Sequence, residues 1–216
     1  MGGLVGADEL ARMGLRVLHF SPIGRGESWG HDDFCGLEGQ DSFRAALDFV
    51  HAARGVDPER VAVVSFSLGV ALALPVLARE GERLGTHLLI DWEGPSNREG
   101  MLALGALPPA AEAAHQADPA LFWSHREPLE FIPDISCHYL RIQGEVDHAL
   151  GTAGRGHALE LVRAAAEGRA ASSQLNTNPP RLSTLGQAQA SLVWAPRETA
   201  ALNRLLREQL KERLIL

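Results

Sequence analysis

The chain has 216 residues, of which 45% are hydrophobic and 22% charged, a balance typical of a globular protein and not of a disordered one. A formal net charge of −7 disfavours binding to nucleic acid or to an anionic membrane surface. The two cysteines are too few for a disulfide scaffold, and no zinc-site spacing is present. Neither a signal peptide nor a run of about 18 apolar residues is found, so we expect a cytoplasmic protein.

Short apolar runs alternate with helical patterns along the chain. The expected strands are Leu15–Phe20, Val61–Phe66, His87–Asp91 and His138–Ile142. The expected helices are Ala7–Met13, Asp41–Arg54 with Asp41 as its N-cap, Leu68–Glu80, Gly156–Glu167 and Pro196–Leu214. This order predicts an α/β fold with a mostly parallel sheet flanked by helices, as a single domain over residues 1–216.

One segment, Glu93–Pro133, breaks this alternation with six prolines and alanine-rich helical pieces. It is too long for a plain connection between a helix and a strand, and long insertions in compact domains are often lids or binding loops. An extra pair of helices packed on the sheet edge is the alternative. We therefore expect a helical insertion around residues 93–133, acting either as a lid or as added packing.

The most informative segment joins the Val61–Phe66 strand to the following helix, with the sequence Ser65-Phe66-Ser67-Leu68-Gly69. It fits the G-x-S-x-G nucleophile elbow with Ser65 in place of the first glycine, a strained strand-to-helix turn that exposes the hydroxyl of its central serine. The positions two before and two after approach each other, and both residues here are small. The pattern predicts Ser67 as a nucleophile, with the Leu68 N–H as an oxyanion donor at a helix N-terminus that favours an anion.

Three further motifs, with the elbow, resemble the α/β-hydrolase superfamily in the esterase, dienelactone-hydrolase and peptidase-like style. They are the loop His19–Ser28, the pair Gly2-Gly3, and Gln143–Asp147 after a strand. The resemblance implies that Gly3 supplies a second oxyanion N–H and that Asp147 is the acid of a catalytic triad. Asp91 is the alternative acid, because it too ends a strand. No cofactor and no metal ion are implied.

The catalytic base is less clear. The resemblance places a histidine in a loop after the last strand, yet Asn176–Pro196 has none, and the last histidine in the sequence is His157. His157, at the start of a helix, is the first choice for the base. His148 is the alternative, ranked lower because it adjoins Asp147 and adjacent side chains rarely aim at a common point.

The resemblance also indicates a shortfall at the front, where the first three strands of the superfamily have no counterpart before Gly2. The third of these strands would lie between the strands ending near Phe20 and Phe66, so its absence predicts a gap in the sheet with unpaired ladder groups. A misassigned start codon, a degraded gene remnant and a partner chain that completes the sheet are three explanations, of which we favour the first two.

Two functions follow from the resemblance. The first is a serine hydrolase that acts on a carboxylic ester or related small-molecule acyl substrate. The alternative is a non-catalytic or degraded α/β-hydrolase-like protein, a binding module or truncated paralogue, which the missing histidine and front strands favour. A nucleotide-binding Rossmann domain is disfavoured, because no G-x-G-x-x-G is present and Glu27, Asp32 and Asp33 would repel a pyrophosphate. The substrate and the oligomeric state stay open.

Overall fold

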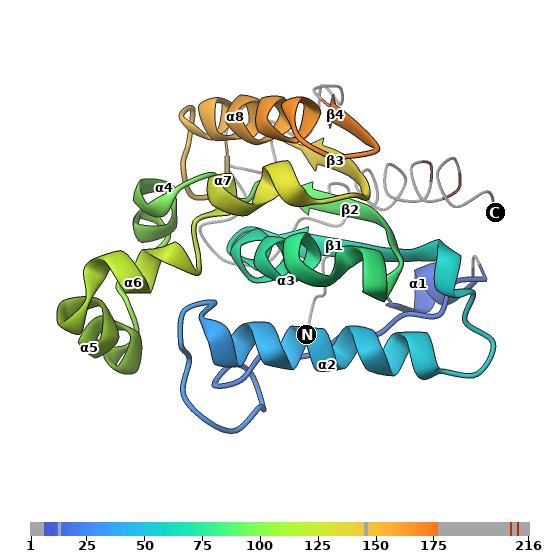
Figure 1. The fold of residues 1–216 in the computed structure, drawn as a ribbon, viewed down its shortest axis with the longest axis horizontal. Coiled ribbons are helices and arrows are strands. Elements are labelled where there is room, and N and C mark those ends of the chain that lie inside the picture. The colour runs from blue at the N-terminus through green and yellow to red at the C-terminus, as the bar shows by residue number, and fades with distance from the viewer. Residues whose placement is uncertain (1–6, 13, 145–146, 177–207, 209–210, 212–216) are drawn as a thin grey trace.

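A computed structural model describes residues 7–12, 14–144, 147–176, 208 and 211 (Figure 1). The helix expected over Pro196–Leu214 lies almost wholly outside these residues, and Gly3 lies outside them. In the described part of the chain, no helix is long and apolar enough to cross a membrane. Four parallel strands form one sheet in sequential order: β1 (Val61–Phe66), β2 (Thr86–Trp92), β3 (His138–Ile142) and β4 (Ser172–Asn176).

Strands β1 to β3 lie where the apolar runs predict them. Leu88, Leu89 and Ile90 in β2 are fully buried, which explains why this strand is continuously apolar instead of alternating. Strand β4 was not expected, because its sequence SSQLN has no apolar pattern. It lies at the outer side of β3 and is held by backbone pairing, from His138 with Ser172 to Ile142 with Asn176.

The helices and 3-10 turns are α1 (Ala7–Arg12), α2 (Leu37–Ala52), η1 (Pro58–Arg60), α3 (Gly69–Leu84), α4 (Arg98–Ala103), α5 (Pro109–Ala117), α6 (Pro119–Ser124), α7 (Pro128–Phe131), η2 (Ile132–Asp134) and α8 (Gly154–Glu167). Because consecutive strands are neighbours and such crossovers are right-handed, α3, α7 and α8 share one face of the sheet. Helix α2 packs against α3, as Figure 1 shows.

Helices α2 and α3 differ most from expectation. Helix α2 begins at Leu37, so Asp41 lies inside the helix and is not its N-cap. Helix α3 continues through Pro75 to Leu84, and Pro75 is buried. Burial of the apolar face of α3 offsets the hydrogen bond that a proline removes from a helix interior.

The segment 93–133 is helical, as its composition predicts: residues 98–134 form α4 to α7 and η2. Phe122 and Trp123 of α6 are each 3% exposed, and the Trp123 ring packs edge-on against Phe34. These rings therefore belong to the core. Whether the segment also acts as a lid stays a prediction.

The prediction of a strand at Leu15–Phe20 is wrong, because this segment has no regular secondary structure. It runs beside α2, where the Phe20 and Phe43 rings stack at 5.9 Å, and a groove of about 940 Å³ separates it from β1. His19, next to Phe20, is exposed. A strand needs a hydrogen-bonded neighbour, and in the described residues β1 pairs with β2 alone. The groove lies where the sequence predicts a gap, and its apolar lining includes Leu18, Phe20, Phe43, Leu47, Val63 and Val64.

Both cysteine thiols are expected to be unreactive in the folded protein. Burial raises the pKa of Cys35 to about 12 and that of Cys137 to about 11. Because the thiolate is the reactive form, Ellman's reagent should label neither thiol of the native chain near pH 8 and both in guanidinium chloride. Rapid labelling of the native protein would contradict the burial of these side chains.

Candidate functional site

The ends of three adjacent strands define the site. Phe66, Trp92 and Ile142 are register partners at the ends of β1, β2 and β3, so the residue after each strand emerges at the same edge of the sheet. Backbone hydrogen bonds continue the pairing by one residue: Ser67 N donates to Trp92 O at 2.8 Å, and Glu93 N donates to Ile142 O at 3.0 Å. Ligand sites of α/β proteins occur at this carboxyl edge.

Ser67 occupies the turn between β1 and α3. Its φ of 52° lies in the left-handed region, a strained conformation for a non-glycine residue and one that concentrates at functional sites. A Cβ added at Gly69 would lie 3.5 Å from Ser65 Cβ, so the two positions approach each other as the elbow pattern requires. Helix α3 begins at Gly69, so the positive end of its dipole lies next to Ser67 and favours negative charge there.

The structure brings His148 to Ser67. The distance from His148 Nε2 to Ser67 Oγ is 2.7 Å, a hydrogen-bond distance. The imidazole side chain is 13% exposed, and its ring lies against Phe66 with the centroids 4.7 Å apart. The site therefore holds a serine hydroxyl and an imidazole nitrogen in direct contact, on elements that are 81 residues apart in sequence.

His157, the first choice of base, contacts Ser96 instead of the elbow serine. Its Nδ1 lies 2.6 Å from Ser96 Oγ and accepts from Ser96 N at 3.3 Å, while Ser96 Oγ also reaches Glu160 Oε2 at 2.6 Å. Partial burial lowers the pKa of His157. His157 is thus engaged in fixing the start of α8 to the segment after β2, because its position in the first turn of α8 directs the ring there.

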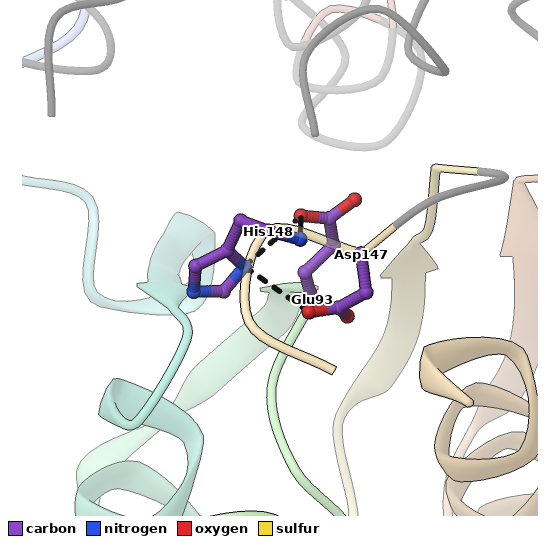
Figure 2. Close-up of side chains that lie close together, drawn as sticks. All are labelled: Glu93, Asp147 and His148. Carbon is purple, nitrogen blue, oxygen red and sulfur yellow. Dashed lines mark hydrogen bonds and ion pairs between the residues drawn. The ribbon is translucent and has the colours of Figure 1, made fainter. Parts of the chain in front are cut away.

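Two buried carboxylates lie beside the other imidazole nitrogen. Figure 2 shows the ring of His148 next to Glu93 and Asp147, with Nδ1 at 3.1 Å from Glu93 Oε2 and 3.4 Å from Asp147 Oδ1. Asp147, the expected acid, therefore lies near the His148 imidazole. Glu93 was missed by the sequence reasoning. The sequence feature that could have identified Glu93 is its position, because it directly follows β2 as Ser67 directly follows β1. In the structure Glu93 also has a positive φ, of 50°.

Glu93, Asp147 and His148 also form the kind of group that could hold a metal ion, because one ligand atom from each lies within 4.8 Å of the others. Each carboxylate oxygen already accepts a protein N–H. Glu93 Oε1 accepts from Gly144 N at 2.9 Å, and Oε2 from His148 N at 3.2 Å. Asp147 Oδ1 accepts from two backbone N–H groups and Oδ2 from a side-chain amide, so the cluster is satisfied by its own donors.

The alternative acid, Asp91, is part of a buried ion pair. Its Oδ2 accepts from Arg141 Nη1 at 2.6 Å and from Tyr139 Oη at 2.8 Å, and Asp91 and Arg141 are both fully buried. Burial opposes the charge on Arg141, but attraction to Asp91 outweighs it and raises the pKa of the guanidinium. Burial, with the nearby Asp91 charge, raises the pKa of Tyr139 well above its usual value, so its O–H stays a donor. Asp91 forms a structural ion pair beneath the site.

This ion pair gives a stability prediction. Arg141→Met leaves the Asp91 carboxylate buried without its cation and should lower the free energy of unfolding in urea by about 3–5 kcal/mol. The double variant Asp91→Asn with Arg141→Met should recover much of that loss. Arg60→Met is the matched control, because Arg60 is 49% exposed and its pair with Asp57 is a solvent-screened surface pair whose loss should change the free energy of unfolding little. Equal effects of Arg141→Met and Arg60→Met would contradict the assignment.

Comparisons with known proteins place the fold. No family model and no curated protein matches the sequence. A Pyrococcus furiosus esterase superposes with a TM-score of 0.57 at 16% identity, over 93% of this chain and 72% of that one. An acylaminoacyl peptidase of Pyrococcus horikoshii superposes with a TM-score of 0.59 at 16% identity, over 89% of this chain and 31% of that one. A puromycin-hydrolyzing peptidase of Mycobacterium tuberculosis superposes with a TM-score of 0.58 at 16% identity, over 84% of this chain and 26% of that one.

The chain therefore has the α/β-hydrolase fold expected from its motifs. Sequence identities this low define the fold and not the activity. The chain spans 22% to 31% of the peptidase chains that it matches, so it is similar to one part of those proteins.

Proposed function

We propose that this chain is a serine hydrolase that acts on a carboxylic ester or a related small-molecule acyl substrate. The observation that carries the proposal is the 2.7 Å contact between Ser67 Oγ and His148 Nε2 on a strained elbow. A serine hydroxyl is a weak nucleophile unless a neighbouring base takes its proton during attack. An imidazole at hydrogen-bond distance supplies that base, on a fold that the chain shares with esterases and peptidases.

In the proposed reaction, Ser67 Oγ attacks the acyl carbon while His148 Nε2 takes the hydroxyl proton. The Leu68 N–H, at the start of α3, would donate to the oxyanion of the tetrahedral intermediate. The imidazolium then protonates the leaving alcohol as the acyl–oxygen bond breaks, which gives an acyl-serine. A water molecule, deprotonated by His148, attacks this ester and releases the carboxylic acid, with the proton returning to Ser67.

Turnover of short-chain p-nitrophenyl esters by the purified full chain tests the proposal. We expect hydrolysis above the rate of the protein-free assay, with the first turnover releasing p-nitrophenol stoichiometrically if deacylation is slower than acylation. A rate no higher than that of the protein-free assay, across acetyl, butyryl and octanoyl esters, would overturn the proposal and favour the non-catalytic alternative.

A further inference from the structure

The two carboxylates beside His148 make different contacts with it. Glu93 Oε2 is 3.1 Å from His148 Nδ1 and also accepts from the backbone N of the same residue at 3.2 Å (Figure 2). Asp147 Oδ1 is 3.4 Å from Nδ1, beyond the usual hydrogen-bond range of about 2.7–3.2 Å. Glu93 therefore holds both the ring and the backbone of His148.

Asp147 instead closes a turn. Its Oδ1 accepts from Ala149 N at 2.9 Å and from Leu150 N at 3.0 Å. Its backbone pairs with Gly151 in both directions, at 2.9 and 3.2 Å, and Gly151 has a φ of 56° that favours glycine. His148 is the first residue inside this turn, so the geometry of the turn decides where the imidazole points.

The other side of Asp147 is also engaged. Its Oδ2 accepts from Gln143 Nε2 at 3.0 Å, and Gln143 Oε1 accepts from the buried guanidinium of Arg141 at 2.5 and 3.1 Å. A Cβ added at Gly154, the first residue of α8, would overlap the Asp147 side chain. The carboxylate thus lies against the N-terminus of α8, which stabilises negative charge. Donors other than His148 satisfy Asp147.

We infer that Glu93 is the carboxylate that orients His148 and stabilises its developing charge, and that Asp147 positions His148 by closing the turn 147–151; the inference rests on the function proposed above. His148 Nδ1–H donates to Glu93 throughout the reaction, and Nε2 takes and returns the Ser67 proton. Glu93 stays ionised and balances the imidazolium. Both carboxylates act through His148 and are positioning residues. The resemblance to α/β-hydrolases implied the opposite assignment, with Asp147 as the triad acid.

Matched variants separate the two roles. Glu93→Gln keeps the shape and removes the charge, so kcat for a p-nitrophenyl ester should fall about 10³- to 10⁴-fold with KM little changed. The double variant Asp147→Asn with Gln143→Glu exchanges donor and acceptor in the hydrogen bond between side chains 143 and 147. The asparagine oxygen at position 147 can still accept from the N–H groups of the turn. The negative charge moves from position 147 to position 143, away from His148. The kcat of the double variant should stay within about tenfold of wild type. Asp147→Ala, which opens the turn, should lose activity that the double variant retains.

Two kinetic results would overturn the inference. In the first, kcat of the double variant is as low as that of Glu93→Gln. In the second, kcat of Glu93→Gln is close to that of the wild type. Thermal unfolding of each variant identifies a loss caused by misfolding. If Glu93→Gln does not fold, Glu93→Ala with added formate replaces it, and rescue of kcat by formate is the expected result. Failure of formate to restore activity to a folded Glu93→Ala protein counts against Glu93.

A readout that does not need turnover separates this inference from the proposed function. Nitrogen-15 NMR of labelled histidine, with His148 assigned by its loss in His148→Gln, reports the imidazole tautomer at a pH where the ring is neutral. We expect the Nδ1-protonated tautomer in the wild type and the double variant, and a changed tautomer in Glu93→Gln. Any other pattern overturns the inference. The expected pattern in a protein without esterase activity would reject the proposed function and leave the carboxylate assignment standing.

Discussion

Replacing Ser67 with alanine is expected to reduce kcat for p-nitrophenyl ester hydrolysis by about 10⁶-fold, to a rate supported only by oxyanion donors and binding. The reason is chemical: without Oγ no acyl-serine forms, and His148 has no hydroxyl proton to take at its 2.7 Å contact. The measurement is the rate of p-nitrophenol release by the full chain under saturating ester. The elbow backbone is kept, so the thermal unfolding midpoint should change little.

Ser42→Ala is the control for this experiment. Ser42 is also half-buried, and its Oγ donates to Glu38 O within α2, so its loss should leave ester hydrolysis unchanged. Retained turnover in a folded Ser67→Ala protein would mean that another group attacks the ester. In that case the elbow is a structural turn only, and the proposed function fails at its first step.

Replacing His148 with glutamine is the second large effect. A glutamine amide fills part of the imidazole volume but cannot accept a proton, so kcat is expected to fall by about 10⁴-fold. The carbonyl oxygen of the glutamine can still contact Ser67 Oγ, which keeps the site packed against Phe66. Steady-state hydrolysis of the same ester measures the effect.

His157→Asn is the matched control, because the asparagine oxygen can replace Nδ1 as the acceptor for Ser96 N. Activity should be retained in His157→Asn and lost in His148→Gln. The reverse result would make His157 the base, as the sequence first suggested, and would require a rearrangement of α8 and its contact with Ser96.

The elbow could be predicted from sequence because every part of it is local. Val61–Phe66 is a continuous apolar strand, α3 follows at once, and small residues flank Ser67. The strands β2 and β3 were predictable from short local runs of apolar residues, Leu88–Ile90 and Tyr139-Leu140. The α/β fold follows from their alternation with helices.

One strand was predicted that is absent from the structure and one is present that was not predicted, and hydrogen bonding to a neighbouring strand explains both differences. Leu15–Phe20 has an apolar pattern but no hydrogen-bonded strand beside it in the described residues. Strand β4 has no pattern, yet it pairs with β3 along Ser172–Asn176. Strand formation depends on a neighbour that can be distant in sequence, and the pattern of one segment does not contain that information.

The arrangement of the site depends on side-chain direction, which the sequence does not contain. Adjacent side chains rarely aim at a common point, which ranks His148 below His157 in the sequence, yet Asp147 Oδ1 and His148 Nδ1 lie 3.4 Å apart. A second carboxylate, Glu93, follows β2. The position of Glu93 depends on the register of Phe66 with Trp92 and on a left-handed residue at the end of β2, both of which are tertiary features.

If His148 activates Ser67, the rate at which a fluorophosphonate phosphonylates Ser67 must depend on His148. Mass spectrometry of the digested protein locates the adduct, and its rate of formation is compared between wild type and His148→Gln. We expect a single adduct on Ser67 that forms about 10²- to 10⁴-fold more slowly in His148→Gln. No adduct, an adduct on another residue, or equal rates in the two proteins would contradict the claim.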